Sequence, residues 1–180
     1  MAKWEPLLAE LIETRRRDLV AYARMLTGSL PDAEDLVQDA LVEAFGGRAR
    51  FTHVAQAEAY TRKVIASRFI DGTRRKATER KALGRLRRPE VDTAAGPDLL
   101  AEHRTDVTRA LQTLPARERA CVVLRYLQHL TIEETAEQLG LSAGSVKRYV
   151  HDGVARLNTE LGTTADQSEM DVIAVEMRRV

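Results

Sequence analysis

Aromatic residues, cysteine and long apolar runs are scarce in this 180-residue chain. Phe, Trp and Tyr make up 4% of it, Gly and Pro together number fifteen, and Cys121 is the only cysteine. Ala, Leu, Arg and Glu dominate instead, and no window alternates apolar and polar residues in the way a half-buried strand does. The expected fold class is therefore all-α.

These absences also exclude several classes of function. A single cysteine cannot form an internal disulfide, and four histidines without ligand spacing do not indicate a metal site. No glycine-rich phosphate loop or catalytic constellation occurs, so we expect no cofactor and no enzyme activity. No apolar run approaches the ~20 residues of a membrane helix, and the N-terminus lacks the layout of a signal peptide. We therefore expect a cytoplasmic protein without membrane insertion.

The net charge of +1 conceals a strong segregation of charge along the chain. Residues 61–88 contain eleven Lys and Arg against two acidic residues, a net of +9. Residues 32–58 contain six acidic residues against two Arg, a net of −4. Such segregation predicts one surface for a polyanion and another for a protein partner. For the run 80–88, a solvated charge cluster is an equally good interpretation.

The most informative segment is Thr131–Val150, which reads as two helices joined by a tight turn. Thr131 and Glu134 have the spacing of a capping box, Gly140 is placed to end the first helix, and Ser142 to cap the second. Val146 and Val150 then recur at helical spacing. Small or apolar residues at the joint and caps on both helices predict a helix-turn-helix, which indicates DNA binding.

The rest of the chain reads as amphipathic helices separated by loops. Residues 7–26 form the first, with Leu8, Leu11, Ile12, Leu19 and Ala23 on the expected apolar face; helices over 33–45, 55–76, 99–114 and 116–128 follow. Gly84 to Asp98, with two prolines and a weakly apolar stretch, predicts a linker. We thus expect a first domain over residues 1–83, a linker over 84–98, a second domain over 99–162 and a tail over 163–180.

Four further segments precede the helix-turn-helix in a characteristic order: Leu19–Gly28, Asp32–Gln38, Ser67–Arg75 and Leu114–Arg119. Together with Thr131–Val150 they resemble an extracytoplasmic-function (ECF, group 4) sigma factor of RNA polymerase, over about Leu7 to Leu161. The resemblance implies two helical domains. The first binds the polymerase core and opens the −10 element of a promoter, and the second reads the −35 element. It implies core RNA polymerase and promoter DNA as partners. An anti-sigma factor can be a further partner, although no residue identifies one.

The resemblance assigns three sets of residues. The set expected to bind core polymerase comprises Asp32, Glu34, Asp35, Gln38 and Asp39. The set expected to bind −10 DNA comprises Arg62, Lys63, Ser67, Arg68, Asp71, Arg74 and Arg75, beside a pocket for an unpaired base built by the loop over 46–53. The set expected to bind the −35 element comprises Ser142, Ser145, Lys147, Arg148 and His151.

Some positions depart from the family pattern. Tyr60-Thr61 stands where Trp-Leu is frequent, Ser67 where Asn is frequent, and Tyr149, Asp152 and Val154 where further basic residues are frequent. The departures at Tyr149, Asp152 and Val154 leave the −35 contact to Ser145, Lys147, Arg148 and His151 and put the usual −35 sequence in doubt. Three alternatives to a sigma factor remain at this point: a helix-turn-helix repressor or activator that binds DNA as a dimer, a sigma-like protein without DNA contacts, and an enzyme.

Overall fold

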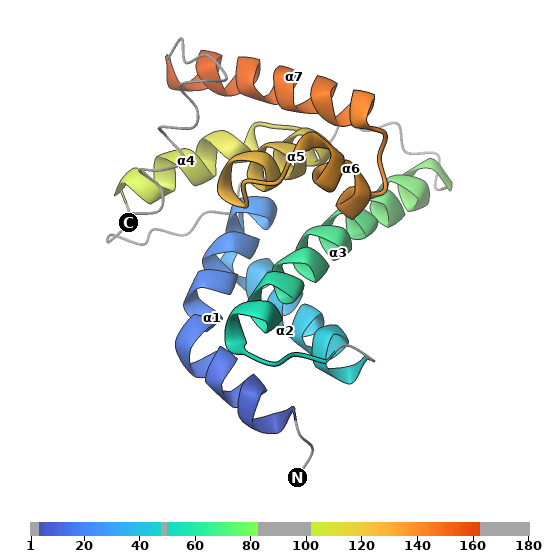
Figure 1. Ribbon diagram of the computed structural model, residues 1–180. Helices are drawn as coiled ribbons and strands as arrows, with labels where there is room; N and C mark the ends of the chain where they lie inside the picture. The colour runs from blue at the N-terminus through green and yellow to red at the C-terminus, as the bar shows by residue number, and fades with distance from the viewer. Residues whose placement is uncertain (1–3, 48–49, 83–101, 163–180) are drawn as a thin grey trace. The chain divides into compact units, whose positions relative to one another are not determined.

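The computed structural model describes residues 4–47, 50–82 and 102–162, and every regular element in these ranges is an α-helix. The expected all-α fold is therefore confirmed. The chain divides into two compact units, residues 1–95 and 96–180, each of which has its own set of helices (Figure 1). The helices are α1 (Glu5–Thr27), α2 (Leu30–Gly46), α3 (Val54–Ala82), α4 (Glu102–Gln112), α5 (Ala116–Leu127), α6 (Ile132–Leu139) and α7 (Ala143–Leu161).

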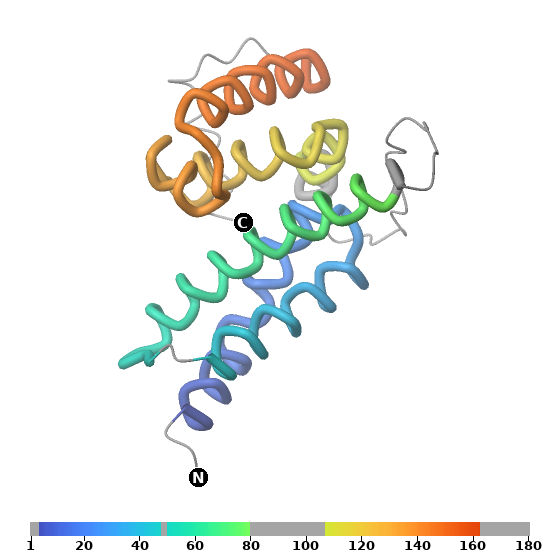
Figure 2. The backbone as a smooth tube through the Cα atoms, turned by 90° about the vertical axis from the view of Figure 1, so that its right-hand side faces the viewer, coloured from blue at the N-terminus to red at the C-terminus, as the bar shows by residue number. Residues whose placement is uncertain are grey.

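In the first unit, α1, α2 and α3 pack against one another, and the tube drawing shows them side by side (Figure 2). Leu11, Leu19 and Ile65 are among the fully buried side chains of this core. Burying a leucine or isoleucine stabilises a fold by roughly 1.5–3 kcal/mol, so this apolar seam holds the bundle together. The acidic residues of α2 lie outside this core.

The turn between α1 and α2 follows the local signals of the sequence. Gly28 adopts a left-handed conformation with φ of 80° and donates its N–H to the carbonyl of Arg24, which ends α1. The hydroxyl of Ser29 then accepts a hydrogen bond from the N–H of Asp32 and caps α2, with Pro31 in its first turn.

Two expectations for this unit were wrong. Ile12 was expected on the buried face of the first helix, but its side chain is 41% exposed. The third helix was expected to end near Lys76, but α3 continues to Ala82. Five of the six residues 77–82 are Ala, Glu, Arg or Lys, which are good helix formers, so intrinsic propensity continues the helix beyond its apolar stripe.

In the second unit, α7 packs on α4, α5 and α6, and α5 also contacts α6. Val123, Leu124 and Val146 are fully buried between these helices. Cys121 is also buried, as expected for a core residue, and burial raises the pKa of its thiol to about 12. A thiol in this state is not reactive at neutral pH.

Helices α5 and α7 approach closely at Gly153. A Cβ atom at this position would lie 2.7 Å from Cγ2 of Val122, closer than such atoms normally come. Gly153 is therefore needed for its small size, and its helical backbone is not strained. This close contact fixes α7 on α5 without consuming any charged group.

Three expectations fall wholly or partly on residues that the structure does not describe. The linker over 84–98 lies within residues 83–101, and the tail over 163–180 lies outside the described ranges, as do the side chains of the basic run 80–88. Within the residues that are described, no helix has both the length and the apolarity needed to cross a bilayer.

Candidate functional sites

The acidic residues of α2 lie on the solvent side of the first unit. Asp32, Glu34, Asp35, Gln38 and Asp39, the set expected to bind polymerase, are all exposed. Two of them also hold neighbouring helices. Glu34 accepts a hydrogen bond from Arg16 of α1 at 3.1 Å, and Asp39 accepts one from Arg68 of α3 at 3.2 Å. Asp32 and Asp35 carry no such ion pair within the described residues.

Val42 is a member of this acidic surface that the sequence analysis missed. Its side chain is 67% exposed, more than that of any other large apolar residue described. It lies seven residues after Asp35 and three after Asp39, so the helical repeat brings it onto the same face. An apolar residue surrounded by charged ones is the usual composition of a protein-binding surface. The signal was present in the sequence, because Val42 falls outside the buried stripe of Val37, Ala40 and Ala44.

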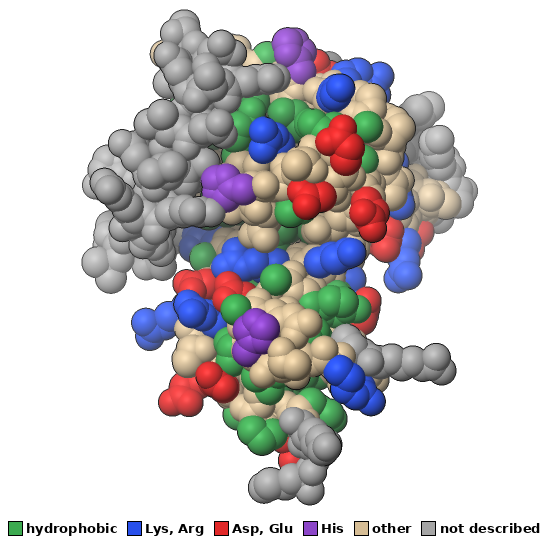
Figure 3. All heavy atoms as spheres, in the orientation of Figure 1, with side chains coloured by type: hydrophobic (Ala, Val, Ile, Leu, Met, Phe, Trp, Pro, Cys, Tyr) green, Lys and Arg blue, Asp and Glu red, His purple; other side chains and the backbone are tan. Residues whose placement is uncertain are grey.

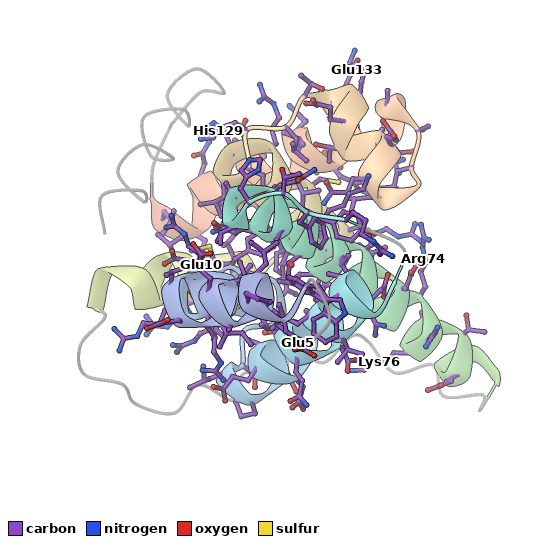
Figure 4. All side chains as sticks on the ribbon, turned by 60° about the horizontal axis from the view of Figure 1, so that its bottom comes forward. Glu5, Glu10, Arg74, Lys76, His129 and Glu133 are labelled. Atoms are coloured by element: carbon purple, nitrogen blue, oxygen red, sulfur yellow. The ribbon has the colours of Figure 1, made fainter. Side chains whose placement is uncertain are left out.

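One face of α3 presents a row of polar side chains. Lys63, Ser67, Asp71 and Arg74 recur every three or four residues, so they share this face. Lys63 and Asp71 are exposed, Ser67 and Arg74 are half-buried, and Figure 4 shows Arg74 pointing away from the bundle. Arg74 donates to Asp71 at 3.4 Å. Arg75 is exposed beside this row, which we call the open face of α3.

The other two arginines of the expected −10 set, Arg62 and Arg68, point to neighbouring helices. Arg68 donates to Glu43 of α2 at 2.6 Å as well as to Asp39. Arg62 pairs with Glu58 at 2.8 Å, and its guanidinium lies 5.3 Å above the ring of Tyr22 in α1. The seven residues therefore do not form one surface, because these two brace α3 against the bundle.

An aromatic run ends at the open face of α3. The rings of Trp4 and Phe45 are 6.3 Å apart, those of Phe45 and Phe51 are 5.3 Å apart, and those of Phe51 and Tyr60 are 5.4 Å apart. Tyr60 is 38% exposed and lies three residues before Lys63. The loop residue Phe51 is thus held beside an exposed ring on the face that carries the polar row.

The helix-turn-helix has the local chemistry that its sequence predicts. Thr131 and Glu134 form a complete capping box, which lowers the pKa of the Glu134 carboxyl because the charged form accepts the N–H of Thr131. Gly140 ends α6 with φ of 59°, and the hydroxyl of Ser142 accepts the N–H of Ser145 at 3.1 Å to cap α7. The predicted helix-turn-helix is confirmed.

Acidic side chains gather over α6, as Figure 3 shows, and Glu133 projects outward there (Figure 4). Glu133, Glu134 and Glu137 are all exposed. A face of this charge repels phosphate groups, so it is unfavourable for binding a nucleic acid.

The residues expected to bind the −35 element lie at the N-cap and on the first half of α7. Lys147, Arg148 and His151 are exposed, while Ser142 and Ser145 are joined by a hydroxyl–hydroxyl hydrogen bond of 2.8 Å. Lys147 and His151 are four residues apart and share a face, and Arg148 lies on the adjacent one. None of the three carries an ion pair within the described ranges.

Comparisons with known proteins agree with this architecture. Residues 11–79 match the Sigma-70 region 2 family, and residues 104–157 match the Sigma-70, region 4 family. The first match covers α1 to α3 apart from their ends, and the second covers the helix-turn-helix. The fold and its two modules thus define the sigma-70 class of transcription initiation factors.

Whole-chain relatives make the assignment more specific. The chain is 33% identical over 174 residues to an RNA polymerase sigma-E factor of Streptomyces avermitilis. The aligned region covers 93% of this chain and 89% of the relative. It is 30% identical to the ECF RNA polymerase sigma factor SigM of Mycobacterium tuberculosis over 155 residues, 85% of this chain and 76% of SigM. The chain belongs to the ECF group of sigma-70 family RNA polymerase sigma factors, and its partners are core RNA polymerase and promoter DNA. The alternative of a dimeric repressor or activator is not favoured.

A solved structure has the same fold. It is the sigma factor RpoE in complex with the anti-sigma factor NepR from Bartonella quintana, with a TM-score of 0.55 and 22% identity, covering 91% of this chain and 96% of that one.

Proposed function

We propose that this sigma factor contacts core polymerase through α2, the −10 element through the open face of α3, and the −35 element through α7. The observation that carries the proposal is the exposure of one acidic and two basic helical faces in the two family regions. In this proposal the first domain, over 1–83, recognises the −10 element and the second, over 99–162, recognises the −35 element. The segment 84–98 joins the two domains. As an initiation factor the chain supplies no catalytic group of its own, and it acts in the cytoplasm, where the polymerase is.

The polymerase-binding surface is centred on Asp35 and Val42. Asp35 is exposed and takes part in no ion pair within the described residues, so its charge is available to a basic partner. Val42 supplies apolar area that loses contact with water on binding, and buried apolar residues surrounded by polar ones contribute most of the energy of typical interfaces. Asp39 and Glu34 act in this surface while they also hold α3 and α1.

The −10 surface consists of Lys63, Ser67, Asp71, Arg74 and Arg75. Ammonium and guanidinium groups bind phosphates, and the release of counterions makes the affinity dependent on salt. Arg62 and Arg68 are assigned to this site as positioning residues, because the guanidinium of Arg62 lies over Tyr22 of α1 and that of Arg68 pairs with Asp39 and Glu43 of α2. Phe51 and Tyr60 form the wall on which an unpaired base stacks, since a stacked base is stabilised by roughly 1–3 kcal/mol.

The test of this function uses the purified chain with core polymerase on a promoter identified by mapping start sites after overexpression. Asp35→Lys is expected to weaken core binding by about tenfold or more, because it reverses a charge at the centre of the interface. Glu13→Lys, an equal reversal on an exposed position of α1, is the matched control and should leave binding unchanged. Far-ultraviolet circular dichroism checks that both variants remain helical.

Two outcomes would contradict the proposal. Unchanged polymerase affinity for Asp35→Lys would remove the assignment of α2. Tight, sequence-specific binding of duplex DNA by the isolated chain, without any association with polymerase, would overturn the functional assignment as a whole.

We also infer that an anti-sigma factor regulates this chain. The support is the similarity in fold to a sigma factor that was solved in complex with the anti-sigma factor NepR. A protein that covers α2 competes with core polymerase, so co-purification followed by displacement with core polymerase tests this inference. If the co-purified protein remains on the sigma factor after the sigma factor has bound core polymerase, the two do not compete and the inference fails.

A further inference from the structure

Two arginines from different helices of the second unit converge on Tyr149. Arg117, in the first turn of α5, donates from Nη1 to the Tyr149 hydroxyl at 3.5 Å, across 32 residues of sequence. Arg148, the neighbour of Tyr149 in α7, places its guanidinium carbon 5.2 Å from the centre of the tyrosine ring. Both arginines are exposed, and Tyr149 is half-buried between them.

The positive charges of this cluster are not compensated. Within the described ranges, neither Arg117 nor Arg148 has a carboxylate within salt-bridge distance, whereas Arg156 in the same helix lies 3.1 Å from Glu118. The pKa of the Tyr149 phenol is lowered, first by the hydrogen bond from Arg117 and then by Arg148, which indicates a positive potential at its oxygen. Two like charges beside one phenol repel each other, and a bound anion relieves that repulsion.

We propose that Arg117, Tyr149 and Arg148 form a phosphate clamp, which joins α5 to α7 and holds one backbone phosphate of the −35 duplex. Each guanidinium has five N–H donors and uses few of them on Tyr149, so several remain to bind phosphate oxygens. Tyr149 is a positioning residue: its ring supports Arg148 and its hydroxyl holds Arg117. The proposal rests on the assignment of α7 to the −35 element.

The place of the clamp along α7 fits a phosphate better than a base. Tyr149 lies six residues after Ala143, the first residue of α7, which is about 9 Å along the axis. The major groove is about 12 Å wide, and a recognition helix contacts base edges with its N-terminal residues. Residues one to two turns further on reach the phosphates at the edge of the groove. Arg117 comes from another helix and extends the contact beyond α7.

This clamp also accounts for the few basic residues of α7. Lys147 and Arg148 are the only Lys or Arg in its first three turns. Tyr149 occupies the next position, and through it α5 adds a third positive charge to the surface. A contact of this kind binds every sequence equally, because phosphates do not differ between base pairs.

The test measures how the affinity of the holoenzyme for a promoter duplex depends on salt, with an intact and with a scrambled −35 element. Arg117→Ala is expected to reduce the slope of log affinity against log salt by about 1 and to weaken binding about tenfold on both duplexes. Arg17→Ala is the matched control, because it removes an exposed arginine of α1 with no ion pair within the described residues; it should change neither quantity.

Tyr149→Phe separates the clamp from two independent contacts. This variant keeps the ring under Arg148 and removes the oxygen that holds Arg117. If the clamp exists, Tyr149→Phe and Arg117→Ala together weaken binding less than the product of their separate effects. A double variant in which the two effects multiply would overturn the clamp, as would a salt slope that Arg117→Ala leaves unchanged.

Lys147→Ala distinguishes failure of the clamp from failure of the proposed function. This variant should weaken binding to the intact −35 element more than to the scrambled one. If it does so while Arg117→Ala has no effect, only the clamp is wrong. If neither substitution affects binding, the assignment of α7 to the −35 element fails as well, and the clamp fails with it.

Discussion

Helices α3 and α7 are the two that we assign to DNA, and they differ in what their arginines contact. In α3, Arg62, Arg68 and Arg74 each lie within 4 Å of a carboxylate, and two of these pairs reach Glu58 or the acidic residues of α2. In the first half of α7, Lys147 and Arg148 have no such partner within the described chain. Part of the positive charge of α3, the more basic of the two helices, is therefore used in ion pairs within the first unit.

The difference follows from how each helix is held in place. Because α7 is fixed on α5 by apolar contacts, by the absence of a side chain at Gly153 and by the ion pair of Arg156 with Glu118, Lys147 and Arg148 are not needed to form an ion pair with α5. Helix α3 packs on both α1 and α2, and two of its arginines contact them: Arg68 pairs with Glu43 of α2, and Arg62 lies over the ring of Tyr22 in α1. A count of charges along a sequence therefore overestimates the DNA-binding capacity of a helix that packs through its charges.

The largest expected effect comes from removing two positive charges from α7, compared with removing two from α3. Lys147→Ala with Arg148→Ala should lower the affinity of the holoenzyme for a −35-dependent promoter by about 100-fold, at roughly 1–3 kcal/mol for each contact. Arg62→Ala with Arg68→Ala removes the same charge, but we expect a loss below about fivefold, because both groups are already paired. Electrophoretic mobility shift at fixed salt measures both; equal losses would break the comparison.

An intermediate effect is expected from the close packing that holds α7. Gly153→Ala should lower the free energy of unfolding by about 1–3 kcal/mol, because the added Cβ meets Val122. Gly144→Ala is the control in the same helix: nothing lies within 4 Å of its Cβ position, and a small stabilisation of about 0.5 kcal/mol is expected. Urea titration followed by circular dichroism measures both, and Val122→Ala should partly rescue Gly153→Ala. Equal stability of the two glycine variants would show that α7 is held differently.

The smallest effect concerns Glu118, which among the described residues of the second unit is the one buried acid. Burial raises the pKa of its carboxyl, Arg156 opposes this, and Asp152 adds to it. A raised folded-state pKa means that Glu118 favours the fold below its unfolded pKa and loses that contribution as pH rises through the folded value. The stability of Glu118→Gln relative to the unsubstituted chain should therefore increase as pH rises above the ordinary glutamate pKa of about 4.3. The opposite trend would mean that the ion pair with Arg156 outweighs burial, and that α7 is held by charge as α3 is.

Much of the fold could be predicted from the sequence because its signals are local. Thr131, Glu134, Gly140 and Ser142 act within one helical turn, and their hydrogen bonds form as the sequence indicates. The failures, Ile12 and the end of α3, occurred where periodicity alone had to decide which face is buried or where propensity continued a helix beyond its apolar stripe. Such questions depend on neighbours that are distant in sequence.

The candidate sites could be predicted only as sets of residue types. Sequence reasoning selected exposed and charged residues on α2, α3 and α7, but it could not distinguish an arginine that faces solvent from one that faces another helix. Arg68 is 25 and 29 residues from its partners Glu43 and Asp39, and Arg117 is 32 residues from Tyr149. Val42 was missed because an apolar residue on a helix is ordinarily taken as part of the core.

The sequence by itself determined that this chain is helical, that it has two modules, and that it belongs to the sigma factors, because helix caps, periodicity and motif order are written in neighbouring residues. The tertiary structure decided which charges are available to partners. Ion pairs such as Arg68–Asp39 and hydrogen bonds such as Arg117–Tyr149 join residues of different helices. Their existence depends on the distance and angle at which two helices pack, which no local pattern records.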